Sequence, residues 1–363
     1  MKKNKNYVDL KDQPVPEGQH LLEVDDLKMY FHTEDGVVRA VDGVSYTLDR
    51  GETLGVVGES GSGKSVTAMT IMGLISMPPG KIEGGDVRYR GRSILEMTEE
   101  EMQHIRGNDI AMIFQDPMTS LNPVYKIGKQ VGEGLRLHRG YSKQEALKRA
   151  TELLDLVGIP EPEKRVNEYP HQFSGGMRQR VMIAMALACD PDILIADEPT
   201  TALDVTIQAQ IIELMQEMQE KNGNAIIMIT HDLGVVADMA DKIMVMYAGR
   251  PVEFGTAEEI FYESRHPYTW GLIRSIPEQA IDEKKPLTPI HGNPPSLMNL
   301  REGCVFSPRC PYATDKCRKQ RPERVVTESG HYSACHYSGD PEFLKNAPET
   351  SRTRKDSKKG GEA

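Results

Sequence analysis

The chain has 363 residues and a formal net charge of -10, from 44 Lys and Arg against 54 Asp and Glu. This length can bury a large core and suits one large domain with an appendage, or two domains. The acidic balance argues against nucleic acid as the main partner, and the sequence has no apolar run long enough to cross a bilayer. A polar stretch follows the basic residues at Met1–Asn6 where a signal peptide needs an apolar one, so we expect a cytoplasmic chain.

The first elements predicted along the chain are extended. Residues 1–20 are polar and contain Pro and Gly, which indicates a flexible lead-in. Apolar residues at Leu21–Val24 and Leu27–Phe31 predict strands, a turn is expected at Glu34–Gly36, and Val37–Leu48 alternates like a half-buried strand. The N-terminal part is therefore expected to be an antiparallel β region.

A glycine-rich loop follows at Gly58–Ser65, with the spacing G-x-x-x-x-G-K-S. The apolar strand Thr53–Val57 precedes it, and a helix is expected over Ser65–Ile75, which is the context that this motif requires. Glycines let successive backbone N–H groups surround a polyanion, and the N-terminus of the helix adds positive potential. The sequence thus predicts a phosphate-binding loop, in which Lys64 reaches the β- and γ-phosphates and the Ser65 hydroxyl ligates Mg²⁺.

The middle of the chain alternates between apolar strands and helices. A hairpin is predicted at Gly84–Gly91 and a buried strand at Ile110–Phe114. Residues 122–188 have a helical pattern, with breaks at 158–160 and at 169–170, which indicates an inserted helical subdomain.

Four more elements follow that insertion: the strand Ile193–Ala196, an amphipathic helix at Thr206–Asn222, and strands at Ala225–Thr230 and Asp241–Tyr247. Strands that alternate with helices predict an α/β fold with a mainly parallel sheet covered on both faces. From about Gly255 Pro becomes frequent, which predicts a linker into a small module that contains four cysteines. From Asn346 onward the chain is polar and charged, and we expect a disordered tail.

Polar residues stand at the ends of three of these strands, namely Gln115, Asp197 with Glu198, and His231. Ligands of parallel α/β sheets bind at the C-terminal ends of the strands. Asp197 can hold Mg²⁺ directly or through water, and Glu198 can orient the attacking water. Gln115 can ligate the metal or contact that water, and His231 can donate a hydrogen bond to the γ-phosphate.

The stretch Phe173–Arg180 reads as the start of a helix, with Ser174 as its N-cap and two glycines after it. This arrangement is a second phosphate-binding device. One nucleotide needs only one phosphate loop, so a second anion site on a helical subdomain suggests that it serves the nucleotide of a partner subunit.

These motifs together resemble the nucleotide-binding subunit of an ABC transporter. They correspond to the Walker A motif (Gly58–Ser65), the Q-loop (Gln115), the signature (Phe173–Met177), the Walker B motif (Ile193–Glu198), the D-loop (Ala202–Asp204) and the switch histidine (His231). The resemblance implies an ABC-type P-loop NTPase over residues 21–255, with a helical subdomain at about 122–188. Phe173 and Met177 depart from the commonest signature, which has Leu and Gln there.

The resemblance also implies the residues of the site. The catalytic residues would be Glu198, His231, Gln115 and Lys64, and the Mg²⁺ ligands would be Ser65, Gln115 and Asp197. By family analogy Phe31 lies nearest the adenine, with Tyr30 as the alternate, although either ring could equally be a core aromatic of the hairpin. The remaining ATP contacts would be Gly58, Glu59, Ser60, Gly61, Ser62, Gly63, Lys64, Ser65, Val66, Gln115, Ser174, Gly175, Gly176 and Asp204.

The C-terminal part is similar to the ATPase subunits of oligopeptide and dipeptide importers, through His266–Thr269, Gly292–Leu297 and Gly303–Pro311. This places an extension at 256–340 and the charged tail at 341–363. The implied function is ATP hydrolysis that powers peptide import. Alternatives are the same role in an importer of nickel or another small solute, and a soluble ABC ATPase that takes no part in transport.

The implied partners are a second ATPase subunit, usually a related but different chain, two integral membrane permease subunits and, indirectly, an extracytoplasmic peptide-binding protein. The expected location is the cytoplasmic face of the cell membrane. Cys304, Cys310, Cys317 and Cys335 could form a four-thiolate site. Their spacing lacks the C-x-x-C pair usual for zinc, and related subunits are thought to carry a [4Fe–4S] cluster. A cluster, a zinc ion and uncoordinated thiols remain the alternatives.

Overall fold

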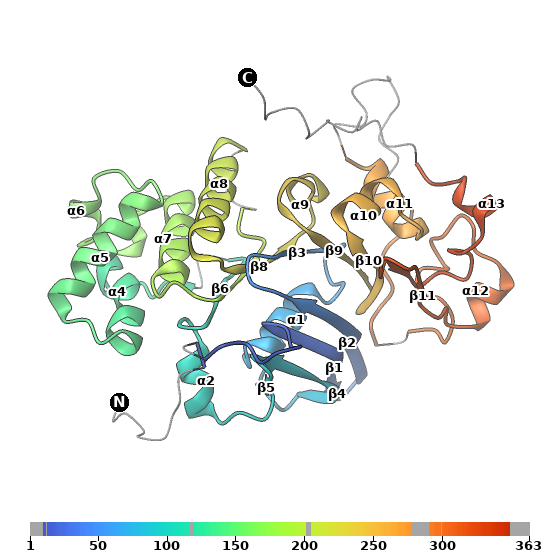
Figure 1. Cartoon of the computed structure of the whole chain (residues 1–363), viewed down its shortest axis with the longest axis horizontal. Coiled ribbons are helices and arrows are strands. Elements are labelled where there is room, and N and C mark those ends of the chain that lie inside the picture. Colours follow the sequence, from blue (N-terminus) through green and yellow to red (C-terminus); the bar gives the residue numbers. More distant parts are fainter. Residues whose placement is uncertain are drawn as a thin grey trace. The chain divides into compact units, whose positions relative to one another are not determined.

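In the computed structural model of the chain, the described residues are 10–11, 13–116, 120–200, 205–276, 290–298 and 300–348. Figure 1 shows the chain with its helices and strands labelled. The chain divides into two compact units. The first unit takes Met1–Tyr30, Val41–Leu54 and Ser65–Thr230, and the second takes Phe31–Ala40, Gly55–Lys64 and His231–Ala363.

A four-stranded sheet contains the strands expected near the N-terminus, in the order β2-β1-β4-β5. Buried residues alternate along β1 but change phase at Asp26, which has a left-handed φ of 44°, so the two predicted strands form one bulged strand. The predicted hairpin is present, but Gly84 and Gly85 lie inside β4, and its turn is at Arg90–Gly91. The strands are β1 (Leu22–Thr33), β2 (Gly36–Leu48), β4 (Gly80–Tyr89) and β5 (Arg92–Ser93).

The first unit also contains three parallel strands that carry the predicted polar ends. β7 (Ile193–Asp197) pairs with β6 (Ile110–Ile113) on one side and with β8 (Ala225–Thr230) on the other. Every residue of the three strands is buried, as expected for a parallel sheet covered on both faces. The predicted amphipathic helix is α8 (Val205–Asn222), and α2 (Glu99–Ile105) begins with a capping box at Thr98.

Helices occupy the predicted insertion and are interrupted at the two predicted breaks, but a further break that the sequence did not predict separates α4 from α5 at residues 139–142. α4 packs against both α5 and α7. The N-cap of α5 is Ser142 and that of α7 is Ser174, and each Oγ accepts a hydrogen bond from a backbone N–H in the first turn. The elements are α4 (Ile127–His138), α5 (Lys143–Leu156), α6 (Pro162–Arg165), the 3-10 turn η1 (Pro170–Gln172) and α7 (Gly175–Leu187).

The helix after the phosphate loop, α1 (Lys64–Ile71), is shorter than predicted because Gly73 ends it. Gly73 has φ +61°, and the Leu74 N–H donates to the carbonyl of Met69 at 2.9 Å. This is the hydrogen bond of a Schellman cap, which turns the chain away from the helix axis. The strand before the loop, β3 (Thr53–Val57), is fully buried.

The second unit corrects two further expectations. Its strands are antiparallel, with β9 paired to β10 and β12 lying between β10 and β11, so the sheets of the chain are mixed rather than mainly parallel. The segment after Gly255, which was expected to be a linker, begins with two helices, and Pro267 occupies the first turn of the second. The strands are β9 (Lys242–Tyr247), β10 (Arg250–Thr256), β11 (Val325–Val326) and β12 (Tyr332–Ser333).

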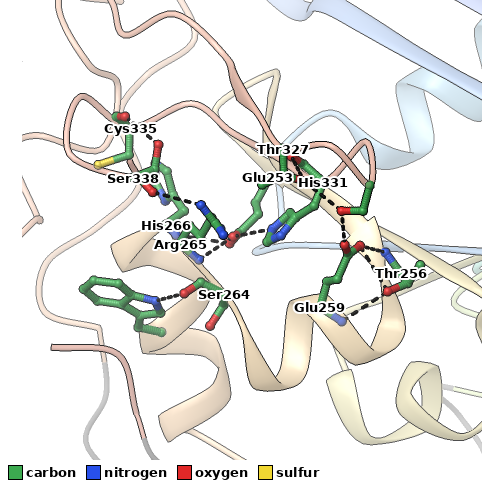
Figure 2. A network of polar contacts seen from close by, with 12 residues as sticks. Glu253, Thr256, Glu259, Ser264, Arg265, His266, Thr327, His331, Cys335 and Ser338 are labelled. Carbon is green, nitrogen blue, oxygen red and sulfur yellow. Dashed lines mark hydrogen bonds and ion pairs between the residues drawn. The ribbon is translucent and has the colours of Figure 1, made fainter. Parts of the chain in front are cut away.

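The helices of this unit are α9 (Leu233–Met239), α10 (Ala257–Tyr262), α11 (Pro267–Arg274), α12 (Asp315–Lys319) and α13 (Pro341–Leu344), the last within the expected tail. Figure 2 shows the buried carboxylate of Glu253 in contact with two other segments of this unit. Glu253 on β10 accepts hydrogen bonds from the backbone N–H of Arg265 at 2.5 Å and of His266 at 3.2 Å. The Glu253 carboxylate also lies 3.0 Å from Nε2 of His331, which precedes β12. In the described ranges, no helix is long and apolar enough to span a membrane.

Candidate active site

The glycines of the predicted phosphate loop are required by close backbone contacts. Gly58 has φ +153° and Gly63 has φ +102°. A Cβ atom on Gly58 would lie 2.2 Å from the carbonyl oxygen of Met246, and one on Gly63 would lie 2.3 Å from that of Ala40. Any side chain at these two positions would therefore force the loop away from the backbone that supports it.

Lys64 is folded back over the loop. Its side chain is buried, and Nζ donates to the carbonyl oxygens of Gly58 at 2.6 Å and Glu59 at 3.0 Å. Ser62 Oγ is also buried and has no hydrogen-bond partner among the described residues. A buried ammonium beside a buried hydroxyl that lacks a partner suits an anionic ligand, which could accept from both groups.

Two of the three groups predicted to ligate Mg²⁺, Ser65 and Asp197, lie together, whereas the third, Gln115, is bonded to Glu198. Ser65 Oγ donates to Oδ1 of Asp197 at 3.0 Å, and Asp197 is buried at the end of β7. A serine hydroxyl and a carboxylate are oxygen ligands of the kind that Mg²⁺ prefers, and Mg²⁺ usually keeps several waters beside one or two such ligands. The donor set therefore fits the metal that the sequence motifs imply.

The next residue, Glu198, meets the predicted Q-loop residue. Gln115 Nε2 donates to Oε2 of Glu198 at 2.9 Å. Glu198 has a left-handed φ of 48°, and its backbone N–H donates to the carbonyl of Ile229 on the neighbouring strand at 2.9 Å. A non-glycine residue held at positive φ is uncommon, and such conformations gather at functional sites.

The remaining predicted site residues are placed as follows. His231 is exposed and directly follows β8. Ser174 is exposed at the N-terminus of α7, where its Oγ accepts from the Met177 N–H at 3.3 Å. Tyr30 donates its hydroxyl to Asp42 Oδ1 at 2.9 Å, whereas Phe31 is half-buried. Asp204, with the rest of the predicted D-loop, lies outside the described residues.

Two residues that hold the phosphate loop were not predicted. The Glu59 backbone N–H donates to Oη of Tyr268 at 2.9 Å, and the Arg309 guanidinium binds the Glu59 carboxylate at 2.5 and 2.9 Å. Arg309 stands beside Cys310 in the cysteine-bearing segment. The sequence offers no spacing rule that would connect it with a loop 250 residues away.

The four clustered cysteines line one pocket, together with Phe306, Tyr312, Tyr337 and Phe343. Burial raises the pKa of the Cys304 thiol, that of Cys310 to about 11 and that of Cys335 to about 12. Within the part of the chain that the structure describes, no group of three or more His, Cys, Asp or Glu is arranged to hold a metal ion. The predicted gathering of the cysteines is thus present, whereas the predicted metal centre is not supported.

The glycine loop with its buried lysine, the Ser65–Asp197 pair and the Gln115–Glu198 pair define an ATP-binding cassette of the P-loop class. Comparisons with known proteins agree. The sequence model of the ABC transporter family matches residues 41–201, and the model of the oligopeptide/dipeptide transporter C-terminal region matches residues 252–317.

Curated relatives indicate which kind of ATP-binding cassette the chain resembles. The chain is 58% identical over 312 residues to the oligopeptide transport ATP-binding protein OppD of Bacillus subtilis, covering 86% of this chain and 87% of that protein. It is 52% identical over 320 residues to the dipeptide transport ATP-binding protein DppD of Escherichia coli, covering 88% and 97%. The chain belongs to this family of ATP-binding transport proteins, and it is an ABC-type ATPase.

Solved structures show the same fold. A dimeric ATP-binding cassette in a post-hydrolysis state, bound to ADP and Pi, is similar with a TM-score of 0.60 and 29% identity. The match covers 65% of this chain and 98% of that chain. The structure of cbiO1 from Clostridium perfringens, described as part of the ABC transporter complex cbiONQ, is similar with a TM-score of 0.56 and 29% identity over 67% of this chain and 91% of that chain.

Proposed function

We propose that the chain is the ATP-hydrolysing subunit that powers peptide import through an ABC transporter. The relatives named for oligopeptide and dipeptide transport span nearly the whole of their own length in the match, including the C-terminal region. The observation that carries the proposal is the Gln115–Glu198 contact at 2.9 Å, beside the Ser65–Asp197 contact at 3.0 Å, because both join predicted catalytic motifs.

The proposed mechanism is in-line attack of water on the γ-phosphorus. Lys64 Nζ, which donates to two carbonyl oxygens of the loop, exchanges them for phosphate oxygens when ATP binds and neutralises part of the charge of the triphosphate. Mg²⁺, when bound to Ser65 and Asp197, offsets the negative charge of the phosphates. Glu198 orients the attacking water, Gln115 holds the Glu198 carboxylate in place, and His231 donates to the γ-phosphate.

We also propose that each ATP is enclosed by two subunits. Ser174 and Gly175 are exposed and Gly176 is half-buried at the start of α7, which is 13 residues long, so this helix N-terminus is available to the triphosphate of a neighbouring ATPase subunit. Closure on ATP and reopening after hydrolysis then drive two permease subunits in the membrane. In this proposal the chain lies on the cytoplasmic face of the membrane, and a second, related ATPase subunit completes the pair.

The experiment is purification of the intact assembly from membranes, followed by reconstitution in liposomes with its extracytoplasmic binding protein. We expect permease subunits and a second ATPase to co-elute, and we expect ATP hydrolysis to rise when a di- or oligopeptide is supplied. Stimulation by a nickel complex and not by peptides would favour the alternative cargo. A chain that purifies without any integral membrane partner would contradict the transport role.

We further propose that the four cysteines hold a [4Fe–4S] cluster. The support for this proposal is that all four cysteines line one pocket, as the ligands of a four-thiolate cluster must. A four-iron cluster is larger than one ion, so its ligands need not converge as zinc ligands do. When bound, the cluster would cross-link the small module, which has few apolar residues of its own.

An anaerobic preparation of the full chain tests this proposal. Four irons with matching sulfide and a brown chromophore are expected, and all should be lost when Cys335 is replaced by Ser. Replacement of Cys189, which lies outside the pocket, is the matched control. A colourless protein without iron, prepared with anaerobic iron supply, would rule the cluster out.

A further inference from the structure

A single arginine of the C-terminal module, the segment that contains the four clustered cysteines, binds the phosphate loop through both terminal nitrogens of its guanidinium group. Arg309 Nη1 and Nη2 bind the two oxygens of Glu59 at 2.5 and 2.9 Å, and Nη1 also donates to Oη of Tyr247 at 3.3 Å. The remaining donors reach the carbonyls of His291 at 2.9 Å and Ile290 at 3.1 Å. All five N–H groups of the guanidinium therefore have partners.

This ion pair is sheltered from solvent. The side chain of Arg309 is 5% exposed and that of Glu59 is 28% exposed. Tyr247, Tyr268 and Phe306 pack against one another beside it, with ring centroids 4.7 to 5.3 Å apart. The hydrogen bonds with Glu59 raise the pKa of Arg309, so its charge is permanent at any physiological pH.

Glu59 is the second residue of the phosphate loop, and three separate groups hold it. Arg309 binds its carboxylate, Tyr268 accepts from its backbone N–H at 2.9 Å, and Lys64 donates to its carbonyl at 3.0 Å. Two of the three come from beyond residue 266. The part of the chain that follows the nucleotide motifs thus fixes both the backbone and the side chain at this end of the loop.

The charge of Glu59 gives this contact a consequence for ligand binding. A carboxylate on a phosphate loop repels a triphosphate, and the repulsion is strong where solvent is excluded. Arg309 neutralises that carboxylate and holds it in a bidentate contact with the C-terminal module. Without Arg309, an unpaired carboxylate would stand on the loop that must accept a polyanion.

We propose that Arg309 is a positioning residue through which the C-terminal module sets the affinity of the phosphate loop for ATP. Arg309 acts through Glu59 and does not touch the nucleotide. The inference rests on the assignment of Gly58–Ser65 as the ATP-binding loop under the proposed function. Arg309 directly precedes Cys310, which lines the cysteine pocket. The inference therefore gives the C-terminal module a role in nucleotide binding in addition to any role in metal binding.

The test measures equilibrium binding of ATP to the full chain, with the thermal midpoint recorded as a check of folding. Arg309→Ala is expected to weaken ATP binding about tenfold or more, because it leaves a partly buried carboxylate unpaired. Arg309→Lys should give an intermediate loss, since an ammonium cannot make the bidentate contact. Arg318→Ala is the matched control and should bind ATP normally, because this exposed arginine of the same module pairs with Asp315 and, among the residues that the structure describes, with no other acidic side chain.

The double variant separates charge from structure. Glu59→Gln removes the repulsion, so Arg309→Ala combined with Glu59→Gln is expected to recover ATP affinity to within about threefold of the wild type. In the intact assembly, Arg309→Ala should raise the KM for ATP with little change in kcat, because saturating ATP restores the loop.

Normal ATP affinity in a folded Arg309→Ala protein would overturn the inference. A double variant that binds as poorly as Arg309→Ala alone would also overturn it, since the effect would then be structural. Lys64→Ala distinguishes this failure from failure of the proposed function. If Lys64→Ala no longer binds ATP while Arg309→Ala binds it normally, only the inference about Arg309 is wrong. If Lys64→Ala also binds ATP normally, the assignment of Gly58–Ser65 as the ATP-binding loop is wrong as well.

Discussion

Ser65 and Asp197 are 132 residues apart in the sequence, and their side chains are joined by a hydrogen bond of 3.0 Å. The hydroxyl comes from the first turn of α1 and the carboxylate from the last residue of β7. A cation that displaces this hydrogen bond would find two oxygen ligands already close together. The two side chains therefore need to move little when the metal binds.

This contact predicts the effect of Ser65→Ala. We expect the Mg²⁺ concentration for half-maximal ATP hydrolysis to rise by about tenfold to a hundredfold, as for loss of a metal-orienting group. Ser65→Thr retains the hydroxyl and should require Mg²⁺ nearly as the wild type does. An unchanged Mg²⁺ requirement in Ser65→Ala would remove Ser65 from the metal site.

A buried ion pair in the first unit predicts a large loss of stability. Asp192 accepts from the Tyr89 hydroxyl at 2.7 Å and from Arg90 at 2.5 and 3.1 Å, and both Arg90 and Asp192 are buried. Asp192→Asn leaves the guanidinium without its counter-charge and should lower the free energy of unfolding by about 3–5 kcal/mol. Tyr89→Phe removes one neutral donor and should cost about 1–2 kcal/mol. Urea denaturation of both variants checks that Asp192→Asn loses more unfolding free energy than Tyr89→Phe does. Equal losses of unfolding free energy in the two variants would contradict this prediction.

His266 predicts a pH dependence of stability. Burial lowers the pKa of His266 from 6.5 to about 3, and its Nδ1 accepts from the Tyr268 N–H at 3.1 Å as the N-cap of α11. The unfolded chain takes up a proton near pH 6.5. The folded chain does not, so this contribution to stability is present above that pH and is lost as the pH falls toward 3.

His266→Asn keeps a capping oxygen but does not titrate. Between about pH 7.5 and about pH 5.5 the wild type should therefore lose about 1.4 kcal/mol more unfolding free energy than this variant. Parallel urea titrations at the two pH values measure the difference. Equal losses in the two proteins would show that His266 keeps an ordinary pKa in the folded chain.

Two helix caps with matching geometry test the shared ATP site. Ser142 and Ser174 each accept one backbone N–H at 3.3 Å, at the starts of α5 and α7. Replacement of either by Ala should cost about 1 kcal/mol of stability. Only Ser174→Ala should lower ATP hydrolysis of the assembly, by about tenfold or more, because only Ser174 belongs to the anion site that we propose for a partner's nucleotide. Equal activities would contradict the composite site.

The gathering of the polar strand ends at one edge of the sheet could be predicted because it follows from local patterns. Gln115, Asp197 and Glu198 end or follow adjacent buried strands, and parallel strands bring their C-terminal ends to one edge. The ends of helices were harder to predict from the sequence. α1 ends at Ile71 because Gly73 takes a left-handed conformation, although apolar residues continue beyond it.

The rest could not be predicted because it depends on long-range pairing. Nothing in the sequence around Glu253 marks this carboxylate as buried, yet it is buried against His331, which lies 78 residues away. Arg309 reads as a neighbour of cysteines, and no periodicity or spacing relates it to Glu59. β12 has two residues, too few to show any alternation, and it is defined only by its pairing with β10 and β11.

Glu198→Gln in the purified transport assembly tests the central claim most directly. The variant keeps the size of the side chain and one acceptor oxygen for Gln115, and it removes the charge that we propose orients the attacking water. We expect ATP affinity equal to that of the wild type, with hydrolysis reduced by about a hundredfold or more. Hydrolysis at the wild-type rate would contradict the assignment of this carboxylate and, with it, the proposed mechanism.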